Sequence, residues 1–112
     1  MPQDQNNAEL DEFGRFSEPA LLILISLADG PKHGYAMTED ISRVANLRLG
    51  PGTLYGAIAR LESRGLIEGV ETADRRNPYR ITALGEQALR LRLSVLEAIA
   101  SAGRQRLQVE GS

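Results

Sequence analysis

Cysteine is absent from this chain of 112 residues, and histidine occurs once. A chain without cysteine has no disulfide framework, no thiol nucleophile and no zinc site of the cysteine kind. Its acidic residues scatter over outward positions, without the paired spacing that acid–base catalysis requires. The single histidine, His33, stands where a helix is expected to begin, which is typical of a local hydrogen-bonding residue. We therefore expect a protein that is not an enzyme and that has no catalytic residue, metal or cofactor.

Long hydrophobic stretches are missing as well. The longest near-apolar run, residues 20–28, is far shorter than the ~20 residues that a helix needs to span a bilayer. The N-terminus lacks the basic start and the apolar segment of a signal peptide. We therefore expect a cytoplasmic protein with no membrane partner, and the length fits a single domain.

The net charge of −2 conceals an uneven distribution. Residues 1–16 carry four acidic side chains and one arginine and follow no period, which predicts a flexible acidic arm. Its last part can form a helical turn, because Leu10, Phe13 and Phe16 are spaced three apart. Residues 43–80, by contrast, hold seven arginines against four acids. A local basic patch of this kind is compatible with phosphate binding, whatever the whole-chain charge.

Residues 50–66 are the segment around which the chain is organised. Pro51 suits the first turn of a helix, and Gly65 suits the position just past its end. The residues between them that recur at helical spacing form one apolar face, made of Leu54, Ala57, Ile58 and Leu61.

The opposite face of this helix is unusual because it carries almost no bulk. Its small residues are Gly52, Gly56, Ala59 and Ser63, and those that border them are Thr53, Tyr55, Arg60 and Arg64. Glycine inside a helix costs about 1 kcal/mol relative to alanine. A small-residue face bordered by hydroxyl and arginine side chains favours close contact with another large body, which we interpret as DNA.

Two helices are expected before this segment. Residues 20–28 are apolar nearly all round and predict a central buried helix, with Ser17 as a candidate N-cap. Residues 34–45 predict an amphipathic helix, joined by a short turn to the helix over residues 50–65. Its expected inward side chains are Met37, Ile41, Val44 and Ala45, and its outward ones are Thr38, Glu39, Asp40 and Arg43. The last two of these three helices make a helix-turn-helix.

A β-hairpin is expected directly after the helix-turn-helix. Residues 66–72 alternate and predict a strand, and residues 79–82 predict a short return strand. The turn between them carries Arg75 and Arg76 at its tip. A hairpin in this place is a wing, and its basic tip is suited to holding phosphate or entering the minor groove.

The remainder predicts one long helix over residues 83–107, with Thr82 as its N-cap, and a disordered tail over residues 108–112. Such a helix is ~37 Å long at 1.5 Å per residue, more than a small domain needs for its own core. It carries two apolar lines, one through Leu84, Ala88, Leu91, Val95, Ala98 and Ala102 and the other through Leu89, Leu93, Leu96 and Ala100. These apolar residues exceed what the core of one small domain needs. They therefore predict a homodimer joined through the first of the two lines.

With these motifs in order, the chain resembles the PadR family of bacterial transcriptional regulators, in the short form with a single C-terminal helix. The resemblance covers about residues 17–107. The matching motifs are His33-Gly34-Tyr35, Gly52-Thr53-Leu54-Tyr55, Arg60-Leu61-Glu62, Gly65-Leu66-Ile67, Arg75-Arg76 and Tyr79-Arg80-Ile81-Thr82.

The resemblance implies a homodimeric winged-helix repressor that binds a pseudo-palindromic operator in double-stranded DNA. Gly56 departs from the family, which often has proline there, and Asn77-Pro78 replaces a commoner basic–aromatic pair. Some relatives hold flat aromatic compounds between tryptophans, a mode that a chain without tryptophan does not share, so any small-molecule effector is of unknown identity. Together, the residues and the resemblance predict DNA contacts at Gly52, Thr53, Tyr55, Gly56, Ala59, Arg60, Arg64, Arg75 and Arg76.

The expected fold is therefore mainly α with a small β-hairpin. A flexible arm (residues 1–16) precedes a winged helix-turn-helix (17–82), a dimerisation helix (83–107) and a tail (108–112). The principal alternative is a winged helix that binds protein and not DNA. Such modules usually lack a basic wing, so Arg75 and Arg76 favour the DNA-binding interpretation.

Overall fold

The computed structural model describes residues 18–73 and 77–111, without side-chain detail for 109–111. The predicted N-terminal arm, Ser17 and the wing-tip residues Arg75 and Arg76 lie outside the described residues. The elements are α2 (Pro19–Leu27), α3 (Gly34–Ala45), α4 (Pro51–Ser63), β1 (Ile67–Gly69), β2 (Tyr79–Ile81) and α5 (Ala83–Gly111). A mainly helical chain with one two-stranded hairpin was the predicted fold class, and it is confirmed.

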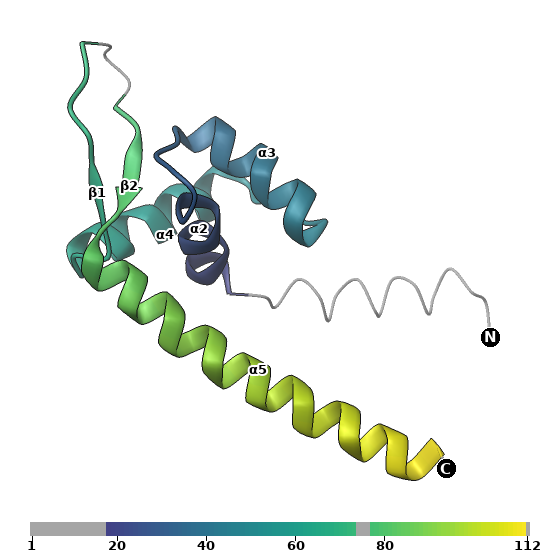
Figure 1. Ribbon diagram of the computed structural model, residues 1–112. Coiled ribbons are helices and arrows are strands. Elements are labelled where there is room, and N and C mark those ends of the chain that lie inside the picture. The colour runs from purple at the N-terminus through teal and green to yellow at the C-terminus, as the bar shows by residue number, and fades with distance from the viewer. Residues whose placement is uncertain (1–17, 74–76, 112) are drawn as a thin grey trace, which may run out of the picture.

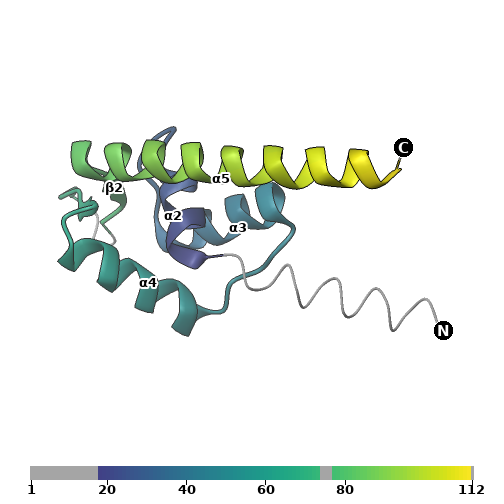
Figure 2. The same ribbon diagram turned by 90° about the horizontal axis from the view of Figure 1, so that it is seen from below.

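Helix α2 is the centre of the core. It lies with α3 between α4 and α5 (Figure 2) and contacts α3, α4, α5 and β2. Ile23 and Leu27 are almost completely buried, as an all-round apolar helix predicts. The helix starts at Pro19, and Glu18 occupies the N-cap position that was predicted for Ser17. The chain turns at Gly30, whose φ of 150° favours glycine.

Helix α3 has the predicted bounds. Two of its side chains, however, have the opposite burial from the one predicted. Val44 was expected inward and is 59% exposed, while Thr38 was expected outward and is buried. The buried residues of α3 are Gly34, Met37, Thr38 and Ile41. They recur at helical spacing, as predicted, but this set lies nearer the start of the helix than the predicted set, which ended at Val44 and Ala45. Thr38 tolerates burial because its hydroxyl donates to the carbonyl of Gly34 at 3.1 Å.

Helix α4 confirms its predicted apolar face. Leu54, Ala57, Ile58 and Leu61 are all buried against the core. Gly65 follows the helix with a φ of 74°, in the left-handed region where glycine is favoured. Helices α3 and α4 are the helix-turn-helix, and Asn46 ends α3 in a left-handed conformation.

The two strands of the hairpin are shorter than the predicted ones over residues 66–72 and 79–82. Strands β1 and β2 pair antiparallel over three residues each, with Ile67 opposite Ile81. The two arms stay together beyond the strands, because the Val70 N–H donates to the carbonyl of Pro78 at 2.8 Å. Lys32 adds a backbone bridge on the other side of β2, which the sequence did not predict.

Helix α5 begins at the predicted N-cap. The Gly85 N–H donates to the Thr82 hydroxyl at 3.0 Å, and that hydroxyl donates to the carbonyl of Gly65 at 2.7 Å. A Cβ on Gly85 would overlap the carbonyl oxygen of Leu66, so glycine allows the close approach. The helix projects from the domain, while the hairpin leaves in another direction (Figure 1).

The predicted end of α5 at Leu107 is wrong. The helix continues to Gly111, so residues 108–111, assigned to a disordered tail, are helical. No proline follows Pro78, and the added residues before Gly111 do not stop a helix that is already formed. None of the helices in the described ranges combines the length and the apolar character that crossing a membrane requires.

Candidate nucleic-acid interface

The outer face of α4 is open to solvent. Gly52, Thr53, Ala59 and Arg60 are exposed, and Gly56 is half-buried. This face of α4 carries little bulk at its small residues, as the sequence predicted. Their role as DNA contacts stays a prediction.

Arg60 lies along this face. Its guanidinium is within 3.6 Å of the position that a Cβ on Gly56 would occupy, one turn nearer the helix start. Neither Arg60 nor the exposed Arg64 at the C-cap forms an ion pair with another described residue. The two guanidinium groups on this part of α4 are therefore available to an external anion.

Tyr55 borders the face and also contacts α3. Its side chain is 53% exposed, and its hydroxyl lies 2.5 Å from the ideal Cβ position of Gly34. Only glycine at the start of α3 leaves room for the ring in this position. The sequence analysis predicted a DNA contact at Tyr55 but gave Gly34 only as part of the motif His33-Gly34-Tyr35, without assigning it a role.

The β-hairpin, or wing, lies beside the end of α4, and its strands pack against the core. Arg80 pairs with Glu68 across the hairpin at 2.7 Å, so this wing arginine already has a partner. Burial, reinforced by the negative charge of Glu62, raises the pKa of Tyr79. The half-buried Tyr79 joins the wing to the core and, through its backbone, to Lys32 at 3.0 and 2.9 Å.

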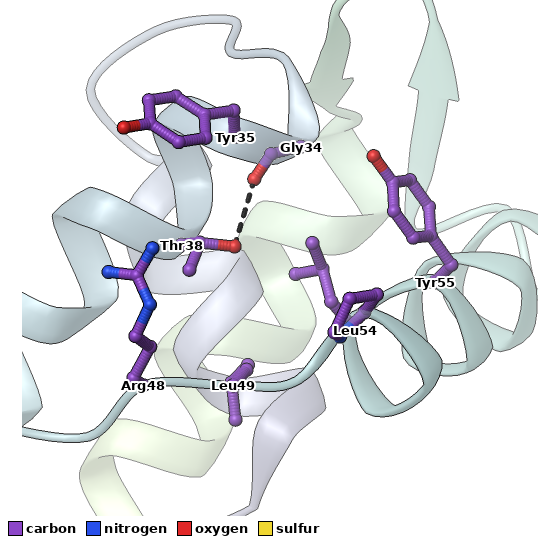
Figure 3. Close-up of a pocket in the computed structure, with 8 residues that line it drawn as sticks. Gly34, Tyr35, Thr38, Arg48, Leu49, Leu54 and Tyr55 are labelled. Atoms are coloured by element: carbon purple, nitrogen blue, oxygen red, sulfur yellow. Dashed lines mark hydrogen bonds between the residues drawn. The ribbon is translucent and has the colours of Figure 1, made fainter.

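A groove beside the start of α4 was missed by the sequence reasoning. It has a volume of about 310 Å³ and lies between α3, the connection that follows it, and the first turn of α4 (Figure 3). Tyr35, Arg48 and Tyr55 line it, together with Gly34, Thr38, Leu49, Pro51 and Leu54. Arg48 was not predicted to be functional because it is a single arginine in the connection between α3 and α4. No sequence pattern distinguishes it there from an ordinary solvent-exposed charge.

His33 does not form the local hydrogen bond that was expected of it. It occupies the N-cap position of α3, and its side chain makes no cap bond. N-capping suits the short oxygen-bearing side chains of Ser, Thr, Asp and Asn better than an imidazole. Within the described ranges, no three His, Cys, Asp or Glu side chains are grouped as metal ligands would be.

Helix α5 carries an apolar surface that the other described residues, 18–73 and 77–82, do not cover. Among the predicted dimerisation residues, Leu91 is 71% and Leu84 52% exposed, and Ala88 is half-buried. Val95, Ala98 and Ala102 are also exposed. Leu89, from the second predicted line, is buried in the core, so that line is partly used within the chain. Ile99, which neither line included, is exposed.

The fold and this surface define a winged helix-turn-helix protein. The family model described as "Transcriptional regulator PadR-like family" matches residues 23–91. The chain therefore belongs to the PadR-like family of transcriptional regulators.

Two relatives and one solved structure extend this result. The transcriptional regulator Rv3488 of Mycobacterium tuberculosis is 39% identical over 83 residues, covering 71% of this chain and 77% of that protein. An uncharacterized 37.1 kDa protein in a Streptomyces fradiae transposon is 45% identical over 75 residues. That match covers 67% of this chain but 22% of the longer protein. A PadR family transcription regulator from Clostridium difficile shares the fold, with a TM-score of 0.73 at 24% identity over 80% of this chain and 97% of the other.

Proposed function

We propose that this protein is a sequence-specific DNA-binding transcriptional regulator, acting as a repressor and binding a pseudo-palindromic operator as a homodimer. The observation that carries the proposal is the exposed small-residue face of α4, across which Arg60 extends without an ion-pair partner among the described residues. Membership of a family of transcriptional regulators supports it.

The dimensions of α4 suit the major groove. A helix with its side chains is ~10–12 Å across, and the major groove of B-DNA is ~12 Å wide. Small residues at Gly52, Gly56 and Ala59 lower the bulk on the side that would meet the base edges. Thr53, Tyr55 and Arg60 supply the groups that hydrogen-bond to bases or phosphates, and Arg64 adds charge.

The proposed dimer rests on α5. An exposed apolar surface through Leu91 and Val95 on a helix that projects from its domain is suited to burial against the same helix of a second copy. A twofold dimer presents two copies of α4, which requires an operator with two inverted half-sites. Arg75 and Arg76 at the two wing tips would then hold the flanking backbone.

The test is a binding measurement at several salt concentrations. The DNA upstream of the protein's own gene is first scanned for an inverted repeat. One duplex carries that repeat, and the other has the same base composition in scrambled order. Tighter binding to the repeat, with a stoichiometry of two chains per duplex, supports the proposal. Absence of binding to both duplexes at low salt would favour a winged helix that binds protein, which is the alternative function.

A further inference from the structure

The end of α4 and the start of α5 are joined by hydrogen bonds between residues that are far apart in the sequence. The Thr82 hydroxyl donates to the carbonyl of Gly65, 17 positions away, at 2.7 Å. The Thr82 N–H donates to the carbonyl of Leu66 at 3.1 Å. The same hydroxyl accepts from the Gly85 N–H at 3.0 Å, in the first turn of α5. One side chain, that of Thr82, therefore bonds to both helix ends. We call these four residues the α4–α5 junction.

The α4 side of the junction is tied to the last turns of that helix. The Leu66 N–H donates to the carbonyl of Leu61 at 3.0 Å, and the Gly65 N–H donates to the carbonyl of Glu62 at 3.0 Å. Leu61 directly follows Arg60 in the chain. Any movement of Gly65 and Leu66 is therefore passed through the backbone to the part of α4 that carries Arg60.

The α5 side of the junction is closely packed. Gly85 is buried, and a Cβ atom on it would overlap the carbonyl oxygen of Leu66 and approach the Ile81 side chain at 2.8 Å. The first turn of α5 therefore lies with its backbone directly against the segment that follows α4. Close-packed contacts of this kind transmit displacement, because neither side has free space into which it can move.

The junction fixes an angle that the hydrophobic core fixes less closely. Helix α2 lies with α3 between α4 and α5 (Figure 2), and α2 contacts both of these helices. Apolar contacts are non-directional, so they set the distance between helices better than the angle. Hydrogen bonds depend on both distance and direction. Thr82 therefore restrains the angle between α4 and α5 at the point where the two helices come together.

This angle determines where the two copies of α4 lie in the proposed dimer, because the dimer forms along α5. Helix α5 projects from the domain (Figure 1), and its first apolar line, from Leu84 to Ala102, is about 27 Å long at 1.5 Å per residue. A rotation of about 10° at the junction moves a point at that distance by about 5 Å. One base pair of B-DNA rises about 3.4 Å, so such a rotation changes which half-site spacing the dimer fits.

We propose that Thr82 is a positioning residue that makes the dimer select operators with one spacing between their half-sites. Its hydroxyl holds α4 at a fixed angle to α5, so the two α4 helices keep one separation and one relative orientation. Thr82 acts through Gly65 and determines spacing, whereas the outer face of α4 determines base preference. The inference rests on the proposed function, and in particular on assembly through α5.

The test uses the full-length dimer and three duplexes. They carry the inverted repeat with its natural spacer, with one base pair added, and with one base pair removed. Thr82→Val keeps the shape of the side chain and removes the hydroxyl. We expect the ratio of affinities between the natural and the altered spacers to fall about fivefold, the effect of losing one hydrogen bond. Thr82→Ser retains the hydroxyl and should keep the wild-type ratio.

A control separates positioning from stability. Thr82→Val also removes the N-cap of α5, which lowers the stability of the protein. Ile41→Val removes one buried methylene from α3, away from the junction, and lowers the stability by a similar amount. Thermal unfolding checks that the two losses match. Ile41→Val should leave the ratio between spacers at its wild-type value, because the angle between α4 and α5 is unchanged.

A distance measurement without DNA gives an independent readout. The chain has no cysteine, so Ser63→Cys, at the exposed end of α4, carries one spin label in each subunit. Double electron–electron resonance then measures the distance between the two labels of the dimer. We expect a narrow distribution of distances with Thr82, a broader one with Thr82→Val, and a narrow one with Thr82→Ser.

The outcomes separate this inference from the proposed function. The positioning role of Thr82 is overturned, and the proposed function stands, if a dimeric wild type binds the repeat and Thr82→Val keeps its ratio between spacers. The same conclusion follows if the label distances of Thr82→Val are as narrow as those of wild type, if Thr82→Ser behaves as Thr82→Val does, or if Ile41→Val lowers the ratio equally. A wild type that is monomeric, or that binds none of the duplexes, would overturn both proposals.

Discussion

The hydroxyl of Tyr55 lies 2.5 Å from the point where a Cβ atom on Gly34 would be. The contact joins the start of α3 to the outer margin of α4, two parts of the helix-turn-helix that are 21 positions apart in the sequence. It means that a residue proposed to contact DNA is positioned by a glycine that does not itself reach the DNA-facing side of α4. The orientation of Tyr55 therefore depends on the absence of a side chain at Gly34.

Gly34→Ala tests this dependence. The added methyl displaces the Tyr55 ring outward, which is possible without unfolding because the ring is half-exposed. We expect DNA affinity to fall by about 1 kcal/mol, the size typical of coupling between residues in contact, with little change in thermal stability. Binding measurements in wild-type and Tyr55→Ala backgrounds form a double-mutant cycle.

The cycle has a clear contrary outcome. In the Tyr55→Ala background, Gly34→Ala should have no further effect on DNA affinity. An equal loss in both backgrounds would mean that Gly34 acts without Tyr55. Gly103→Ala is the control, because a Cβ at that position of α5 meets no atom within 4 Å.

The apolar surface of α5 leads to a prediction about assembly. We expect a dimer at micromolar concentration in light scattering. Leu91→Glu or Val95→Glu places an unpaired charge in the proposed interface and should give a monomer. The monomer should stay folded, because Leu91 is 71% exposed in the single chain and adds little to the core.

Ser94→Glu is the matched control for this prediction. It adds the same charge to a polar stripe of α5, outside both apolar lines, and the dimer should persist. This stripe consists of Glu86, Arg90, Ser94, Glu97, Ser101 and Arg104. A wild type that is monomeric at these concentrations would contradict the proposed assembly.

The wing arginines give a separate prediction in salt dependence. Arg75 and Arg76 lie outside the described residues, so their role rests on the sequence. Replacing both by alanine should weaken binding to operator and random duplex alike. The slope of log K against log salt should fall by up to ~1.8 for each subunit. A loss of sequence preference with an unchanged slope would mean that the wing reads bases.

How far the fold follows from the sequence depends on the range of each contact. Helix α4 was predicted with its bounds and its buried face, because Pro51, Gly65 and the apolar period are local signals that agree. In α3 the apolar residues fit two overlapping stripes, and packing on α2 selected the one that contains Thr38 and leaves Val44 exposed. Periodicity alone does not choose between such stripes.

The parts of the candidate site that were missed depend on contacts distant in sequence. Lys32 pairs with Tyr79 through backbone hydrogen bonds. Such a pairing does not depend on side-chain type, so the sequence pattern does not predict it. The role of Gly34, which the sequence analysis named only within a motif, is explained by the position of Tyr55, and Arg48 lines a groove that exists only once α3 and α4 are packed. Composition and period describe one element at a time, so these relationships appear only in three dimensions.

The outer face of α4 leads to the last prediction, which separates base reading from phosphate binding. Gly52, Gly56 and Ala59 let the helix approach closely but cannot hydrogen-bond a base edge through their side chains. Direct readout then depends on Thr53, Tyr55 and Arg60, with DNA shape supplying the remainder.

Arg60→Ala should cost about 1–3 kcal/mol and relax the preference at a few base pairs, if the guanidinium pairs with guanine. Selection of binding sites from a random pool with the Arg60→Ala protein measures this. A uniform loss over all sequences would instead assign Arg60 to a phosphate. The guanidinium lies over Gly56, near the middle of the exposed face, which favours the guanine contact over one at the edge.

Ala59→Glu tests the face itself. The side chain is exposed, so the substitution should leave the fold and the dimer intact. A carboxylate placed against the DNA repels phosphate and adds bulk where the face has none, so binding should be abolished. Circular dichroism and light scattering check fold and assembly, and titration with the operator duplex checks binding. If Ala59→Glu bound the operator as wild type does, α4 would not be the DNA-reading helix, and a winged helix that binds protein would become the better account of this exposed face.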